Sequence, residues 1–393
     1  MHSHIAMRPI FITAIAYFLI TAFISIFMLF ILFCLACGSE LSMPFVAENR
    51  LPIIERGYYN NSSLLGWTLK PNLEVSLIKK NEPAVSKPYF STNASGFRVT
   101  PIAQANQPTG IILGDSFAQG FYLTDTQSIP WRIAEQTKNN VINTGVGGYS
   151  TDQELITLEK VISPGVSWVI LLFFANDLPW NLERTSWALH KPRYKITGDQ
   201  VNFSILEAPA STNIPPSESV SNTNKIELCC IYDGSKLLEL TKFKFSRYFE
   251  LIPSPMKLIH QIREDYKWSF PYKAQYSYIM PTKFYQNPAS FQREWHIAFQ
   301  MIARMKDLSQ KNQAKFYAVY VPEIGQLLNQ DGIGNKNLPQ QYFMEQCVRH
   351  HITCIDPSEQ FAKNAMQIYV QDDGHFSPYG ANLMAKILSG YIK

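Results

Sequence analysis

The sequence predicts a three-layer α/β/α protein in which helices cover both faces of a central, mostly parallel five-stranded sheet. One observation is the series of short apolar runs at residues 110–113, 141–143, 168–174, 315–321 and 352–355. Such runs are typical of strands that are buried on both faces, as in parallel sheets. The other is that helical patterns separate these runs, apart from one long insertion. This alternation predicts a doubly wound domain, which we assign to residues 108–393.

The helix predictions rest on capping signals and on apolar periodicity. Residues 128–137 and 152–162 follow the first and second strands. For the second helix, Ser150 or Thr151 can act as the N-cap, with Gln153 and Glu154 placed for a capping box. A third helix has one apolar stripe, formed by Phe291, Trp295, Phe299, Ile302 and Met305.

Residues 182–288 interrupt the alternation and are interpreted as an insertion. Two short runs, 194–196 and 201–205, flank Thr197-Gly198-Asp199-Gln200 and predict a hairpin. The rest is rich in proline and aromatic residues, which predicts an irregular lid or subdomain.

The composition excludes several classes of protein. Hydrophobic residues make up 46% of the chain, which allows a sizeable core and excludes a disordered or fibrous protein. The net charge is +4, from 35 Lys+Arg and 31 Asp+Glu that are spread without a basic block. Nucleic acid is therefore not an expected partner.

The N-terminal region predicts a membrane anchor. No charged residue occurs between Arg8 and Glu40, and a bilayer-spanning helix needs about 20 apolar residues. We assign residues 1–8 to a cytoplasmic N-terminus, 9–38 to a transmembrane signal anchor, and 39–107 to a tether and cap segment. The flanking charges place the rest of the chain in the periplasm or outside the cell. A cleaved signal peptide and a lipoprotein site at Cys37 are the alternatives.

The cysteines leave two interpretations open. Cys347 and Cys354 are seven residues apart and could form a disulfide in an oxidising compartment, or they could be small buried residues. No Cys/His pattern predicts a metal site, and no cofactor is expected.

Polar residues follow several of the expected strands, and the carboxyl ends of parallel strands meet at the edge of the sheet where ligands bind. Ser116 follows the first strand in Gly114-Asp115-Ser116. A glycine-rich turn ending at Gly148 follows the second, and Asn176 ends the third. Glycine at the second turn permits close approach of a backbone N–H to a reacting oxygen.

The candidate general base is His375, which lies just before the final helix. A carboxylate two or three residues before a histidine can hold its Nδ1–H, so that Nε2 can accept a proton from a serine. Asp372 is the favoured partner, and Asp373 is the alternative.

These four motifs, in this order, resemble the consensus blocks of the SGNH hydrolase superfamily of GDSL-like esterases. The resemblance extends from about residue 57 to the C-terminus, and its pre-catalytic region is similar to that of bacterial envelope-associated members. It implies a nucleophile at Ser116, a base at His375, and an oxyanion hole formed by the Ser116 and Gly148 N–H groups with the Asn176 amide. The chain departs from the pattern at Ala175, where family members often have glycine.

The resemblance also implies the chemistry. The expected activity is that of a serine esterase with an acyl-enzyme intermediate, acting on an ester. The candidate substrates are O-acyl groups of a cell-envelope polysaccharide. An O-acyltransferase on such a glycan, which would need a partner, and a non-catalytic glycan-binding or assembly module of the same fold are the alternatives.

Overall fold

A computed structural model describes residues 58–79, 89–102, 105–186, 189–209, 225–230, 282–327, 338–370 and 374–392. The chain divides into two units, Met1–Leu51 and Pro52–Lys393, and all described residues belong to the second. The predicted anchor at residues 9–38 lies outside the described residues. Among the helices that are described, none is long and apolar enough to span a bilayer.

The central sheet has five strands, and every pair of neighbours is parallel, as predicted. Across the sheet the order is β14, β13, β7, β5 and β6. These strands are β5 (Thr109–Gly114), β6 (Asn140–Asn143), β7 (Val166–Phe174), β13 (Lys315–Val321) and β14 (Thr353–Ile355). Each overlaps a predicted apolar run.

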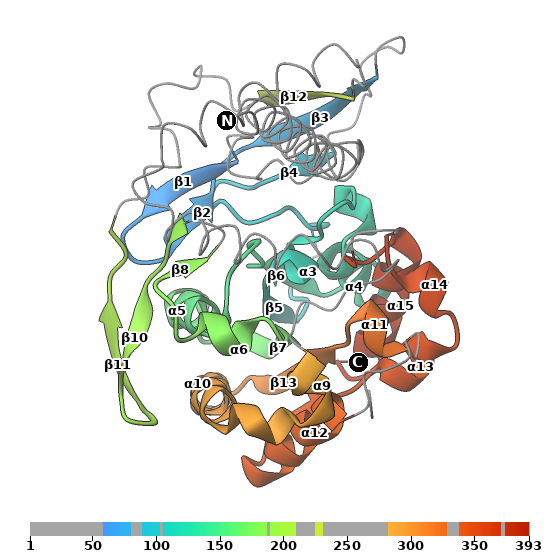
Figure 1. Ribbon diagram of the computed structural model, residues 1–393. Helices are drawn as coiled ribbons and strands as arrows, with labels where there is room; N and C mark the ends of the chain where they lie inside the picture. The colour runs from blue at the N-terminus through green and yellow to red at the C-terminus, as the bar shows by residue number, and fades with distance from the viewer. Residues whose placement is uncertain are drawn as a thin grey trace, which may run out of the picture. The chain divides into compact units, whose positions relative to one another are not determined.

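Helices cover both faces of this sheet (Figure 1). On one face lie α5, α10 and α12, and on the other lie α4 and α15. These helices are α4 (Ile129–Thr137), α5 (Thr151–Val161), α10 (Gln292–Lys311), α12 (Leu338–Arg349) and α15 (Pro378–Ser389). Side chains alternate between two hydrophobic clusters along each strand, so that Ile111 and Leu113 join one cluster and Ile112 the other. This alternation explains why the strands are apolar throughout.

The connections between these elements contain several short helices. They are α3 (Ser116–Gln119), η1 (Asp125–Gln127), α6 (Asp177–Trp180), α9 (Thr282–Gln286), η3 (Pro288–Phe291), α11 (Ile324–Leu327), α13 (Ser358–Ala362) and α14 (Ala365–Ile368). Two of them, α3 and α6, begin directly after β5 and β7 and therefore lie at the carboxyl edge of the sheet.

The order of the strands places a switch in winding direction between β5 and β7. β6 and β7 pair with opposite sides of β5, although β6 follows β5 in the chain and β7 follows β6. Connections after β5 and β7 therefore diverge, which is the arrangement that opens a ligand crevice in doubly wound sheets.

The start of α5 differs from the predicted capping box. Ser150 is the N-cap, but its side chain makes no cap hydrogen bond. Instead its Oγ donates to Asp152 Oδ1 at 2.8 Å, and Glu154 is buried. The carboxylate of Asp152 replaces the backbone N–H groups as the partner of the serine hydroxyl.

The segment before the central sheet and part of the insertion form small sheets of their own. β1 (Tyr59–Ser62) pairs antiparallel with β2 (Gly66–Leu69). β3 (Glu74–Lys79) lies between β4 (Phe90–Ser91) and β12 (Lys225–Cys230). The described part of the insertion also contains the short pair β8 (Thr185–Ser186) and β9 (Leu189–His190).

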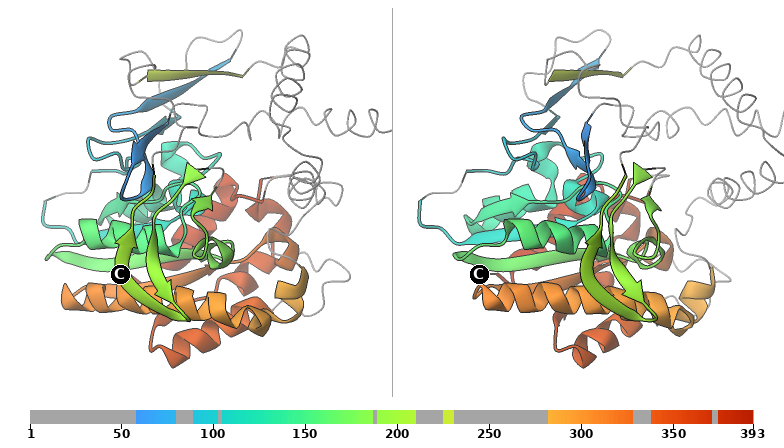
Figure 2. Two further views of the ribbon diagram at one scale, coloured as in Figure 1. Left: turned by 60° about the vertical axis from the view of Figure 1, so that its left-hand side comes forward. Right: turned by 90° about the vertical axis from the view of Figure 1, so that its left-hand side faces the viewer.

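The predicted hairpin in the insertion is present as β10 (Arg193–Thr197) and β11 (Gln200–Leu206). It lies across α10 (Figure 2), where Gln300 accepts a hydrogen bond from the Val201 N–H at 3.0 Å. Gln300 Nε2 also donates to the Asp199 carbonyl at 2.7 Å. The hairpin is therefore fastened to the layer of helices on that face.

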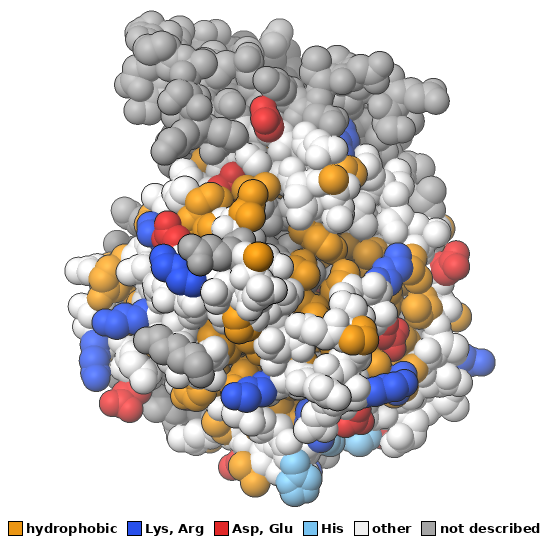
Figure 3. All heavy atoms as spheres, turned by 180° about the vertical axis from the view of Figure 1, so that it is seen from behind, with side chains coloured by type: hydrophobic (Ala, Val, Ile, Leu, Met, Phe, Trp, Pro, Cys, Tyr) orange, Lys and Arg blue, Asp and Glu red, His pale blue; other side chains and the backbone are white. Residues whose placement is uncertain are grey.

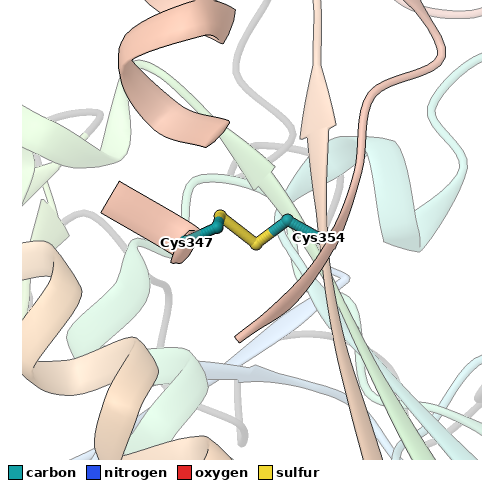
Figure 4. The surroundings of a disulfide bond; sticks show 2 residues. All are labelled: Cys347 and Cys354. Carbon is teal, nitrogen blue, oxygen red and sulfur yellow. A yellow bond between two sulfur atoms is a disulfide. The ribbon is translucent and has the colours of Figure 1, made fainter. Parts of the chain in front are cut away.

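Cys347 and Cys354 form a disulfide with a Cα–Cα distance of 6.1 Å (Figure 4). It joins α12 to β14, the edge strand of the central sheet. Of the two interpretations left open by the sequence, the structure favours the bridge.

On the molecular face shown in Figure 3, charged side chains of both signs are scattered among hydrophobic and polar ones.

Candidate active site

Ser116 lies at a sharp turn where β5 passes into α3. Gly114 has φ 149°, and a Cβ there would lie 2.8 Å from the Ala118 Cβ, so glycine is required for this turn. Asp115 caps α3, because its Oδ1 accepts a hydrogen bond from the Phe117 N–H at 2.9 Å. The turn presents the Ser116 side chain at the carboxyl edge of the sheet.

The structure brings Ser116 and His375 together. Ser116 Oγ lies 2.8 Å from His375 Nε2, across 259 residues of sequence. Ser116 is 9% exposed, and His375 is half-buried. A hydroxyl and an imidazole at this distance can exchange a proton directly.

Aromatic rings surround the imidazole of His375. The centroids of Phe117, Phe121 and Tyr122 lie 5.2, 5.0 and 5.7 Å from its own, and Phe121 is stacked with an interplanar angle of 19°. The His375 carbonyl accepts a hydrogen bond from the Val370 N–H at 2.7 Å. These contacts hold the ring beside Ser116. Asp372 and Asp373, the predicted partners of Nδ1, lie outside the described residues.

Asn176 follows β7 and lies beside the turn of Ser116. It is 6% exposed, and its side chain hydrogen-bonds the carboxylate of Asp115, while its own Oδ1 has no partner among the described residues. An amide carries two N–H groups, so one remains for another acceptor when the other is bonded to Asp115.

Asp115 connects these groups and was not identified from the sequence as a site residue. Burial raises its pKa from 3.8 to about 6, and the Phe117 N–H, His375 and Asn176 act in the opposite direction. Near neutral pH the carboxylate is therefore mostly ionised and can accept the Asn176 amide. The motif Gly-Asp-Ser pointed to its serine, but nothing in the spacing indicates that the aspartate reaches an asparagine 61 residues later.

Gly148 ends a glycine-rich loop that packs on α3. Its φ is 79°, a backbone conformation that favours glycine, and its carbonyl accepts a hydrogen bond from Ser186 Oγ at 2.9 Å. A Cβ on Gly145 would lie 2.4 Å from the Gln119 backbone nitrogen. The glycines therefore allow this loop to approach the helix that carries Ser116.

Three buried acidic residues, Asp152, Glu154 and Asp177, lie on α5 and α6, directly after the glycine-rich loop and Asn176 in the sequence. Asp177 accepts a hydrogen bond from Thr151 Oγ1 at 2.9 Å, and Lys191 Nζ contacts Asp152 Oδ2 at 2.5 Å. Burial, followed by the negative charges of Asp177, Asp115 and Asp152, raises the pKa of Glu154 well above its ordinary value. Neither oxygen of Glu154 has a partner among the described residues, which favours the neutral form.

Arg98 is a second buried group that the sequence did not single out for the site. It is 1% exposed, and its Nε donates to Asp125 Oδ1 at 2.8 Å. Its Nη1 donates to the carbonyls of Gln119 and Gly120, both at 2.7 Å. Arg98 thereby fixes the end of α3. The local sequence Gly96-Phe97-Arg98-Val99 does not indicate that this side chain reaches the end of α3.

Within the described ranges, no group of three or more His, Cys, Asp or Glu side chains is arranged to hold a metal ion.

Comparisons with known proteins give structural neighbours only. No family model and no curated protein matches the sequence. A lipolytic protein of the G-D-S-L family from Desulfitobacterium hafniense DCB-2 is 12% identical, with 73% of this chain and 100% of that chain covered and a TM-score of 0.33. A member of the lipolytic protein G-D-S-L family from Veillonella parvula DSM 2008 is 11% identical. The match covers 71% of this chain and 94% of that chain, with a TM-score of 0.35. The acetyl xylan esterase AlAXEase is 11% identical. The match covers 72% of this chain and 100% of that chain, with a TM-score of 0.37.

Proposed function

We propose that this chain is a serine esterase of the SGNH type, with Ser116 as nucleophile and His375 as general base. The observation that carries the proposal is the 2.8 Å contact between Ser116 Oγ and His375 Nε2 at the carboxyl edge of the sheet. A hydroxyl becomes a useful nucleophile when a base within hydrogen-bond reach can accept its proton.

In the proposed reaction, His375 Nε2 accepts the Ser116 proton as Oγ attacks the carbonyl carbon of an ester. The N–H groups of Ser116 and Gly148 and the Asn176 amide stabilise the oxyanion of the tetrahedral intermediate. The imidazolium then protonates the departing alcohol, which leaves an acyl group on Ser116. His375 then takes a proton from water as the water oxygen attacks the acyl carbon, and it returns this proton to Ser116 Oγ as the acyl–Oγ bond breaks and the carboxylic acid leaves.

The first test is covalent labelling of the full-length chain, purified in detergent, with a fluorophosphonate. We expect one adduct, located by mass spectrometry on Ser116, together with turnover of a short-chain aryl ester. Ser116→Ala should lose both the label and the turnover. A chain that neither reacts at Ser116 nor hydrolyses the ester would instead support the non-catalytic module.

Asn176→Ala should slow turnover by about a hundredfold, because one oxyanion donor contributes on the order of 3 kcal/mol to transition-state stabilisation. The matched control is Asn140→Ala, since Asn140 is exposed on β6 and its side chain donates a hydrogen bond to Thr109 Oγ1 at 3.3 Å. Equal turnover rates for the two variants would show that Asn176 is not an oxyanion donor.

We further propose that the site faces the cell envelope and acts on ester groups of an envelope glycan. The charge-free N-terminal segment and the Cys347–Cys354 bridge support this location, because disulfides persist in oxidising compartments. Acetate released from O-acetylated envelope glycan would support a hydrolase. Acetyl groups that move to an added glycan acceptor would support the acyltransferase. Turnover of aryl esters alone would exclude glycan esters as the substrate class.

A further inference from the structure

Two hydrogen bonds clamp Gly147, the residue before the proposed oxyanion donor. The Trp67 indole Nε1–H donates to the Gly147 carbonyl at 3.0 Å, and the Gly147 N–H donates to Gln119 Oε1 at 2.6 Å. Gln119 lies on α3, the helix that begins with Ser116. The glycine-rich loop is thus tied to the strand β2 on one side and to the nucleophile's helix on the other.

The first of these bonds controls the direction of the Gly148 N–H. The Gly147 carbonyl and the Gly148 N–H belong to the same peptide unit, and all peptide bonds in the described residues are trans. In a planar trans peptide these two groups point in opposite directions. Fixing the carbonyl toward Trp67 therefore fixes the N–H on the side away from Trp67. Neither flanking residue restricts this peptide by itself, because both are glycine.

We propose that Trp67 is a positioning residue of this esterase, whose indole N–H holds the Gly147–Gly148 peptide in the orientation that aims the Gly148 N–H at the oxyanion. The inference rests on the proposed function and adds a residue from outside the four motifs. Without this bond, the carbonyl of Gly147 is left without its buried donor, and rotation of the peptide would withdraw the Gly148 N–H from the hole.

Trp67 is itself held rigidly enough for this role. It is 1% exposed, and its backbone carbonyl accepts a hydrogen bond from the Tyr149 hydroxyl at 2.5 Å. The two rings pack edge to face with centroids 5.6 Å apart. A Cβ on Gly147 would lie 2.7 Å from the Phe121 ring and 3.2 Å from the Tyr59 hydroxyl, so the loop is also enclosed by aromatic side chains. Phe121 is the ring that stacks on His375.

The test compares two Trp→Phe substitutions in the full-length chain in detergent. Trp67→Phe keeps an aromatic ring but removes the N–H. Trp295→Phe is the matched control: Trp295 is equally buried at 1%, and its Nε1–H donates to the Pro288 carbonyl of η3 at 3.1 Å, a bond that involves neither α3 nor the glycine-rich loop. Both variants lose one buried indole–carbonyl bond, so a general effect on folding appears in both.

We expect Trp67→Phe to lower kcat for an aryl ester by about tenfold to a hundredfold with little change in KM, because the interaction acts on the transition state. The affinity for an alkyl boronic acid, which forms a tetrahedral adduct with a serine, should fall by a similar factor. Trp295→Phe should leave both quantities within about twofold of the wild type. Thermal unfolding of both variants confirms that they are folded.

Equal kinetics for Trp67→Phe and Trp295→Phe would overturn the inference while the wild type still hydrolyses esters. A rise in KM with unchanged kcat would also overturn it, since that pattern belongs to a substrate contact. A wild-type chain that neither reacts with fluorophosphonate at Ser116 nor hydrolyses esters would overturn the proposed function, and the inference with it.

Discussion

At the scale of single residues, Asp115 links the two halves of the candidate site. Its carboxylate caps the helix that carries Ser116 and accepts the amide of Asn176. The residue is 2% exposed, so the ionised form lacks most of its hydration. The partners of the carboxylate offset only part of this cost, and the pKa remains raised to about 6.

This raised pKa predicts a specific pH dependence of stability. Because the folded-state pKa of Asp115 lies above 3.8, the folded chain binds this proton more tightly than the unfolded chain does. The resulting stabilisation is fully present below about pH 4 and is lost as the pH rises through about 6, by about 3 kcal/mol. Asp115→Asn should reduce the loss of stability between pH 4 and pH 7 by about this 3 kcal/mol, as measured by urea unfolding at the two pH values.

The control for Asp115 is Asp199→Asn at the exposed turn of the hairpin, where the aspartate side chain is 64% exposed. It should retain the wild-type pH dependence of the free energy of unfolding. If Asp115→Asn retained it as well, the pH dependence would belong to other buried acids such as Glu154 and Asp177, whose pKa values are also raised by burial.

At the scale of elements, a buried ion pair joins the segment after β9 to the start of α5. The side chains of Lys191 and Asp152 are 0% and 1% exposed. Asp152 Oδ1 also accepts hydrogen bonds from Ser150 Oγ and the Gln153 N–H, both at 2.8 Å. This arrangement holds α5 in place beside Asp177 and therefore supports the end of β7.

Lys191→Met should lower the free energy of unfolding by about 3–5 kcal/mol, because it leaves a buried carboxylate without its counter-ion. Arg132→Met is the control, since the Arg132–Glu135 pair on α4 is exposed and such pairs contribute about 1 kcal/mol or less. Chemical denaturation of both variants measures the difference. If both variants lost a similar free energy of unfolding, the buried pair would contribute no more to stability than the exposed pair does.

At the scale of the whole molecule, the candidate site depends on the way the sheet is wound. The chain passes from β5 to β6 and then returns past β5 to β7, and because these strands are parallel, the loops after β5, β6 and β7 lie at the same edge. Helices on both faces bury the sheet, and α15, which follows His375 closely, packs on the same face as α4. The winding brings the last tenth of the chain back to the end of β5.

The proposed cellular location is also a property of the whole chain. We expect the full-length protein to stay with the membrane fraction after a high-salt wash and to be released by detergent. In protein taken from intact cells, Cys347 and Cys354 should resist alkylation until a reductant is added. Release by salt alone, or free thiols at both cysteines, would contradict an anchored protein with its site outside the cytoplasm.

Much of the fold could be predicted from the sequence because local patterns are sufficient for it. The five apolar runs match β5, β6, β7, β13 and β14, and the turn Thr197–Gln200 joins β10 and β11 as predicted. Buried strands, helix stripes and tight turns each depend on neighbouring residues and are therefore visible in a linear sequence. The capping box at α5 was wrong, because Asp152, buried beside Lys191, competes for the Ser150 hydroxyl.

The sequence by itself determined the five strands of the central sheet, the hairpin of β10 and β11, several of the longer helices and the candidates Ser116, Gly148, Asn176 and His375. Only the tertiary structure decided that Ser116 meets His375, that Asp115 holds Asn176, and that Trp67 and Gln119 clamp the loop before Gly148. The physical reason is that these contacts join groups of residues that are 28 to 259 positions apart in the sequence. Such contacts depend on the order of strands in the sheet, for which no single segment carries a pattern.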